Sequence, residues 1–154
     1  MTEHEYAAWR TETIPAYAAD KVASGQWTGE ESIALSTKEH AELLPEGLAT
    51  SENYLFTVED DRGVSVGMLW FVVKTKFNAK IAYVFNIEIR PEHQRRGHAF
   101  SAFVALEAEV LRLGLTGIAL HVFGHNNGAR ALYAKLGFEP TNISLFKPVG
   151  AAEA

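Results

Sequence analysis

The sequence predicts an α+β domain in three layers, with helices flanking a mixed, mostly antiparallel central sheet. Helical signals fill the first third of the chain, and after Gly47 the apolar residues alternate as they do in strands. Helical spacing returns after Arg96, which indicates a helix packed on the sheet. The 154 residues, 47% hydrophobic, suit one domain with its own core. We expect that domain over residues 1–148, followed by a flexible tail over 149–154.

The first predicted helix begins with a capping signal. Thr2 and Glu5 have the spacing at which a hydroxyl caps the first amides while a carboxylate three residues on reaches back. The helix would run from about residue 3 to 23, with Pro15 as the place of a bend and Gly25 beyond its end.

The second predicted helix follows a short connection that contains Trp27. Thr28 and Glu31 repeat the capping spacing, and Pro45 stops the helical pattern. We therefore expect a helix from about residue 29 to 44.

Three strands are expected next, over residues 54–59, 64–74 and 81–89. Residues 60–63, Asp-Asp-Arg-Gly, form a good turn between the first two, so these should pair antiparallel. Residues 76–80 should close the second hairpin.

The last elements are a helix, a strand, a helix and a strand. The first helix opens at Arg96 and ends at Gly114. Residues 118–123 are predicted as the fourth strand, 129–136 as a short helix and 138–146 as the last strand.

Composition excludes several function classes. The chain has no cysteine, so a disulfide framework, a Cys-based zinc site and a thiol nucleophile are all excluded. The net charge of −5, from 14 Lys plus Arg against 19 Asp plus Glu, argues against nucleic acid as a partner. No apolar run reaches the roughly 18 residues that a membrane helix needs. These features predict a soluble, cytoplasmic protein.

The first group of candidate functional residues lies within residues 83–99. There a predicted strand leads through a proline into a turn at the start of a predicted helix. Gly97 and Ala99 let a ligand approach the main chain, and amides at a helix start carry partial positive charge. Arg95 and Arg96 add charge, so the loop suits a phosphate group. The alternative is an ordinary strand-to-helix turn with solvated arginines. Neither the P-loop nor the Gly-x-Gly-x-x-Gly pattern is present.

Pro91, Gln94, Gly97 and Ala99 fill a known pattern. The loop resembles the acetyl-coenzyme A loop of the GNAT superfamily of N-acetyltransferases, Pro-x-x-(Gln/Arg)-x-x-Gly-x-(Gly/Ala). Residues 126–138 resemble the second GNAT signature, Asn-x-x-Ala-x-x-Leu-Tyr-x-x-x-Gly-Phe. The order of elements agrees, except that the strand which usually precedes the first helix is missing or very short.

The resemblance implies acetyl-coenzyme A as cosubstrate and no metal. Loop amides would hold the pyrophosphate, and the pantetheine arm would lie along the strand ending at Ile89, whose amide would approach the thioester carbonyl. Asn126 would bind the arm from the other side. The implied coenzyme-binding residues are Ile89, Gln94, Arg95, Arg96, Gly97, His98, Ala99, Asn126 and Tyr133.

Two catalytic roles follow. Tyr133 is the candidate general acid for the leaving thiolate, because GNAT enzymes commonly place a tyrosine there; the alternative is a packing aromatic.

Glu88 is the candidate base, since a carboxylate inside an apolar strand is costly unless it faces a cleft or a cation. The alternatives are a water relay or an ion pair with Arg90. Alternation places Glu88 on one face with Val84, Asn86 and Arg90, opposite Phe85, Ile87 and Ile89.

The predicted function is direct transfer of an acetyl group to a primary amine of a small molecule or peptide, in a ternary complex. An acetylated cysteine intermediate is excluded by composition. The alternative is a GNAT-fold module that binds acyl-coenzyme A without turnover. A polyamine, an aminoglycoside, an amino acid and a protein N-terminus all remain open as acceptors, and so does a homodimer, since many relatives are dimers.

Overall fold

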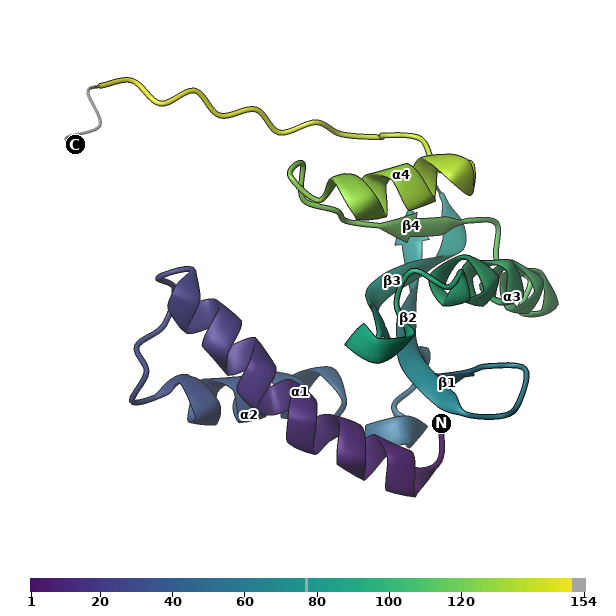
Figure 1. Cartoon of the computed structure of the whole chain (residues 1–154), viewed down its shortest axis with the longest axis horizontal. Coiled ribbons are helices and arrows are strands. Elements are labelled where there is room, and N and C mark those ends of the chain that lie inside the picture. The colour runs from purple at the N-terminus through teal and green to yellow at the C-terminus, as the bar shows by residue number, and fades with distance from the viewer. Residues whose placement is uncertain (77, 151–154) are drawn as a thin grey trace. The chain divides into compact units, whose positions relative to one another are not determined.

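The computed structural model describes residues 1–76 and 78–150. It divides into two compact units, Met1–His121 and Val122–Ala154 (Figure 1). The larger unit holds the four-stranded sheet, and the smaller unit holds the last helix. Of the expected tail, residues 151–154 lie outside the described part of the chain.

Helix α1 (Glu3–Ala23) confirms the first capping box. The Glu5 amide donates to Thr2 Oγ1 at 3.2 Å, and the Thr2 amide donates to Glu5 Oε2 at 2.7 Å. At the other end, Gly25 adopts φ 74°, which only glycine reaches without strain. Both predicted ends of the helix are therefore confirmed.

Helix α2 (Ser32–Leu43) begins about one turn later than predicted, and the second capping box is wrong. The Thr28 hydroxyl donates to Glu31 Oε1 at 3.1 Å, so the two side chains bond each other rather than the helix amides. Glu31 itself is the N-cap residue, in a helical conformation and without a side-chain cap. A short 3-10 turn, η1 (Gly47–Ala49), then leads toward the sheet.

Polar contacts join α1 to α2 in a buried seam. Ser36, fully buried, donates from Oγ to the Ile14 carbonyl at 2.8 Å. The Tyr17 hydroxyl donates to Glu39 Oε2 at 2.9 Å across the same seam. These two bonds fix the two helices against each other. Within α2, His40 is also buried, with Nδ1 2.9 Å from the Ser36 carbonyl oxygen.

The sheet has the order β1-β2-β3-β4. The first three strands, β1 (Asn53–Glu59), β2 (Ser65–Lys76) and β3 (Ala79–Ile89), are antiparallel, and β4 (Ile118–Leu120) is parallel to β3. A mixed, mostly antiparallel sheet without a strand before α1 was the prediction, and it is confirmed.

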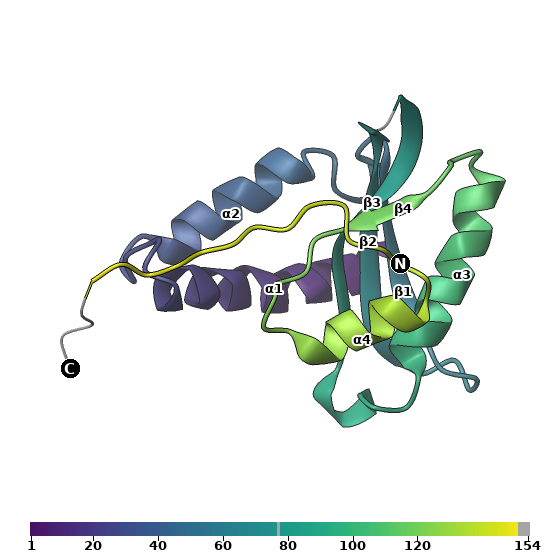
Figure 2. The same cartoon turned by 90° about the horizontal axis from the view of Figure 1, so that it is seen from above.

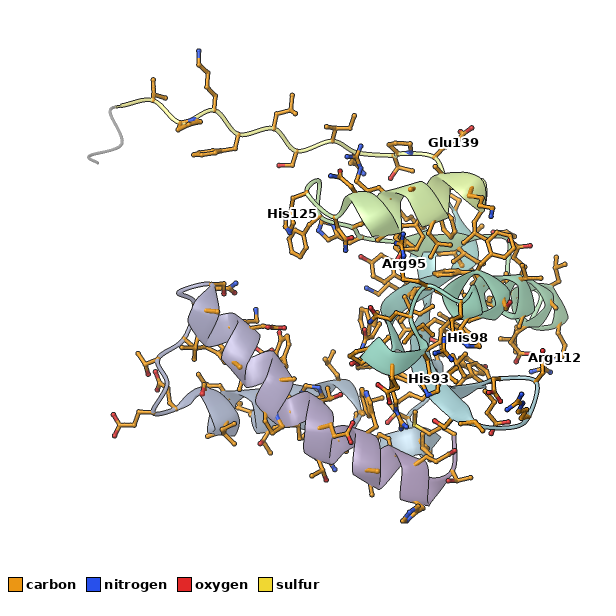
Figure 3. All side chains as sticks on the ribbon, in the orientation of Figure 1. His93, Arg95, His98, Arg112, His125 and Glu139 are labelled. Carbon is orange, nitrogen blue, oxygen red and sulfur yellow. The ribbon has the colours of Figure 1, made fainter. Side chains whose placement is uncertain are left out.

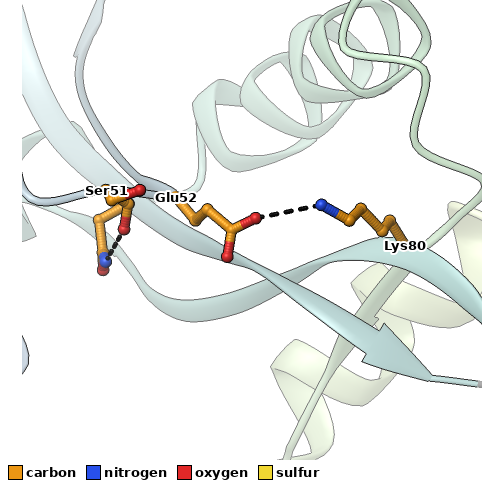
Figure 4. A network of polar contacts seen from close by, with 4 residues as sticks. Ser51, Glu52 and Lys80 are labelled. Carbon is orange, nitrogen blue, oxygen red and sulfur yellow. Dashed lines mark hydrogen bonds and ion pairs between the residues drawn. The ribbon is translucent and has the colours of Figure 1, made fainter.

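Side-chain contacts occur at both ends of the antiparallel strands. At the first turn, Asp60 Oδ1 accepts from the Arg62 and Val64 amides, and the Val64 amide is the main reason that the Asp60 pKa is lowered. At the far end, Lys80 Nζ lies 3.3 Å from Glu52 Oε1 (Figure 4). That exposed pair contributes little energy, but it marks how close the chain before β1 runs to β3.

The helices of the larger unit cover opposite faces of the sheet (Figure 2). On one face, Tyr6 and Trp9 of α1 pack in a buried cluster with sheet residues Leu55, Met68, Trp70 and Val72. On the other face lies α3 (His98–Arg112), whose Phe103, Leu106 and Val110 are buried. The three-layer prediction is thus confirmed within this unit.

A β-bulge in β3 corrects the predicted face of Glu88. Val84 pairs with Phe71 and Asn86 with Trp70, so Phe85 is an extra residue without a cross-strand partner. The bulge moves Val84 to the face opposite Asn86, because strand alternation is interrupted between them. Glu88 keeps Asn86 on its face, the face covered by α1, but not Val84.

The fourth strand is shorter than predicted. Its pairing with β3 stops at Val84 and Leu120, next to the bulge that redirects β3.

In the smaller unit, α4 (Asn127–Lys135) confirms the short helix, but the predicted strand over 138–146 is wrong. A strand needs a ladder partner, and the described residues after α4 have none assigned. Side chains there are exposed, among them Leu145 and Phe146 at 90%.

Candidate active site

The edge of β3 nearest β4 is open along its second half. Parallel pairing covers only Ala82 to Val84, so within the described residues of the larger unit, 85–89 have a strand neighbour on the β2 side alone. An open stretch of edge presents N–H and C=O groups that an extended ligand can pair with.

The open edge runs into a short, tightly held loop. After Ile89 comes a 3-10 turn, η2 (Pro91–His93), and then Gln94, whose Nε2 donates to the Ile89 carbonyl at 2.8 Å. This bond clamps the loop to the end of β3. Arg95 adopts φ 62° and Gly97 φ 83°, so the main chain turns twice through the left-handed region before α3 begins.

Gly97 is the N-cap of α3 and has no side chain with which to cap it. The first amides of a helix lack intrahelical acceptors and carry partial positive charge. The space around Gly97 is open, with no heavy atom within 4 Å of the position of an added Cβ. His93 and His98 lie 6.3 Å apart by ring centroids beside this turn, and Arg95 is drawn apart from them (Figure 3). The arrangement fits a diphosphate.

Glu88 lines a cleft of about 310 Å³ between α1 and the sheet. Gly67 lies on the strand opposite, where an added Cβ would collide with the Glu88 carbonyl oxygen, so only glycine lets β2 and β3 approach so closely. The predicted alternative for Glu88 was an ion pair with Arg90. Both line the cleft, yet among the described residues no cation lies within 4.0 Å of the Glu88 carboxylate.

Asn126 and Tyr133 belong to the smaller unit. Asn126 Oδ1 accepts from the Ala129 amide at 3.2 Å and thereby caps α4, a structural role that the sequence reading missed. The Tyr133 ring packs on Phe138 with centroids 5.6 Å apart. Burial raises the pKa of the Tyr133 hydroxyl, so it is protonated at neutral pH.

His93 and His98 lie beside the loop at the start of α3. Within residues 1–76 and 78–150, however, no three His, Asp or Glu side chains gather as a metal site would require. In that same part of the chain, no helix has the length and apolarity to cross a bilayer.

A profile of the acetyltransferase (GNAT) family matches residues 16–138. This chain belongs to that family. The GNAT resemblance of the two signatures is therefore confirmed, and the chain is an acyltransferase. GNAT enzymes generally use acetyl-coenzyme A.

Two relatives from Bacillus subtilis (strain 168) are similar over nearly the whole chain. The uncharacterized N-acetyltransferase YdgE is 31% identical over 147 residues, 96% of this chain and 94% of its own. The crystal structure of YycN has 30% identity and a TM-score of 0.83, covering 98% of this chain and 96% of that one.

A more distant structure shares the fold alone. It is the aminoglycoside 6'-N-acetyltransferase AAC(6')-Ih from Acinetobacter baumannii, with 18% identity and a TM-score of 0.56 over 75% of this chain and 82% of that one.

The sequence reading missed the α1 side of the cleft. Glu5, Trp9, Glu12 and Ala16 line it at helical spacings of four, three and four. Carboxylates on one helical face were visible in the sequence, but only the packing of α1 shows that this face meets Glu88.

Proposed function

We propose that this GNAT protein transfers an acetyl group from acetyl-coenzyme A directly to a primary amine. The observation that carries the proposal is the continuity of the open β3 edge with the clamped loop and the uncapped start of α3. An extended arm with a diphosphate at one end suits this edge and loop together.

The coenzyme would bind through main-chain groups. Amides from Arg95 to Ala99, with Arg96, Gly97 and His98 between them, would hold the diphosphate, and Gln94 would keep the loop in place through its bond to Ile89. The pantetheine arm would pair with the β3 edge. Asn126, from the smaller unit, would contact the arm in addition to capping α4.

In the chemical step, the amine nitrogen attacks the thioester carbonyl carbon. The new C–N bond forms, negative charge develops on the carbonyl oxygen, and the Ile89 amide stabilises it. Glu88, directly or through a water, takes a proton from the amine. The C–S bond then breaks, and Tyr133 gives its proton to the leaving thiolate. An acetamide and free coenzyme A result.

Calorimetry with coenzyme A tests the first half of the proposal. We expect heat of binding at micromolar to millimolar coenzyme, and its absence would overturn the proposal. Release of free thiol from acetyl-coenzyme A across a panel of amines tests the second half. Coenzyme binding without amine-dependent thiol release would instead favour a GNAT module that senses acyl-coenzyme A.

A further inference from the structure

The cleft beside Glu88 has walls from two different elements. Small side chains of α1, Ala8 and Ala16, leave it open, while Trp9 and Met68 give it an apolar floor. At about 310 Å³ it lies at the lower end of the range for small-molecule pockets, roughly 300–1,000 Å³. Its size suits a small ligand such as an amino acid or a short amine.

Three carboxylates line this cleft, and they are not equivalent. Glu5 is occupied, because its carboxylate accepts from the Thr2 amide in the capping box. The carboxylates of Glu12 and Glu88 have no hydrogen bond or ion pair with another described residue. One comes from α1 and the other from β3, so the cleft offers two separate sites for an ammonium group.

A cation that lines the cleft also lacks a partner. Arg90 lines it, and the part of the chain that the structure covers places no carboxylate within 4.0 Å of its guanidinium. A guanidinium can bind a carboxylate through two parallel hydrogen bonds, so this side of the cleft suits a ligand carboxylate.

We propose that this cleft binds the acceptor of the reaction, and that the acceptor is a free amino acid with a second amino group. One ammonium would face Glu88 and the other Glu12, while the carboxylate would face Arg90. This inference rests on the proposed acetyl transfer and adds the chemical class of its acceptor. A diamine leaves Arg90 unpaired, and an amino acid with an apolar side chain leaves one carboxylate of the cleft unpaired.

A matched acceptor panel tests the class, with free-thiol release from acetyl-coenzyme A as the readout. Ornithine carries all three charged groups, putrescine lacks the carboxylate, and norvaline lacks the side-chain amine. We expect kcat/KM for ornithine to exceed each of the other two by about fivefold or more, the size expected of one charge pair in a partly solvated cleft. Values for ornithine within twofold of either partner compound would overturn the proposal.

Single substitutions test each proposed contact between the cleft and the acceptor. Glu12→Gln should raise KM for ornithine about fivefold, leave kcat unchanged and remove the preference over norvaline. Arg90→Gln should remove the preference over putrescine in the same way. Glu3→Gln is the control, because Glu3 is exposed on the same helix and does not line the cleft.

Failure of this inference is distinguishable from failure of the proposed function. The heat of coenzyme A binding is measured by calorimetry for every variant. It should equal that of the unsubstituted protein, because the cleft residues lie outside the loop. Intact coenzyme binding with no transfer to ornithine overturns the acceptor class alone. Equal losses in Glu12→Gln and Glu3→Gln would also overturn it, whereas loss of coenzyme binding in the unsubstituted protein overturns the proposed function.

Discussion

Gly97→Ala separates the effect of the conformation of the proposed coenzyme loop from the effect of general stability, because α3 offers a matched control. Gly97, before the helix, has φ 83°, and Gly114, after it, has φ 70°. An added Cβ meets no heavy atom within 4 Å at either position. Neither substitution therefore creates a clash, and each should cost only the left-handed backbone strain of about 1–2 kcal/mol.

The two variants should lose similar stability and differ in coenzyme binding. Strain of that size lowers Tm by about 2–8 °C in a chain of this length. Alanine at Gly97 should also disturb the amides that we propose to bind the diphosphate. Losing one charge-assisted hydrogen bond, about 1.5–3 kcal/mol, would weaken coenzyme binding roughly 10- to 100-fold. Thermal denaturation and coenzyme A calorimetry measure both. Equal coenzyme Kd values for Gly97→Ala and Gly114→Ala would refute the reasoning.

Four further changes have defined outcomes. Tyr133→Phe should lower kcat about a hundredfold with coenzyme Kd unchanged, and because burial raises the Tyr133 pKa, the alkaline loss of activity in the unsubstituted enzyme should come above pH 10. Glu88→Gln should abolish the acidic limb of the kcat/KM profile. Gln94→Ala should cost about 1 kcal/mol in thermal denaturation, since it removes one part-buried hydrogen bond. The Thr2 amide lowers the Glu5 pKa below 4.5, so stability from this carboxylate is present above that pH and lost as pH falls through the folded value; Glu5→Gln should flatten the acid side of the stability curve.

Each of these four predictions has an outcome that would contradict it. Unchanged turnover in Tyr133→Phe removes that hydroxyl from the mechanism, and an unaltered acidic limb in Glu88→Gln assigns the base to another group. A Tm for Gln94→Ala equal to that of the unsubstituted protein would show that the loop is held by its backbone alone. If Glu5→Gln and the unsubstituted protein lose stability equally as the pH falls, ionisation of Glu5 does not contribute to the pH dependence of stability.

Local patterns predicted most elements, because their signals lie within a few residues. The Thr2 capping box, the Asp60 turn and the glycines at helix ends each act through bonds or dihedral angles of their own neighbourhood. The same reasoning failed at Thr28, where the two capping side chains bond each other instead of the helix. It also failed for residues 138–146, because a strand needs a partner that local sequence does not specify.

The sequence by itself determined the family, the glycine turn at Gly97, and the order of helices and strands as far as α4, since these follow from short-range spacing and turn chemistry. Only the tertiary structure decided which groups share a surface. The bulge at Phe85 turned Glu88 toward α1, and helix packing brought Glu12 and Trp9 to the same cleft. Contacts between residues more than 70 positions apart depend on how whole faces pack, and no local pattern encodes them.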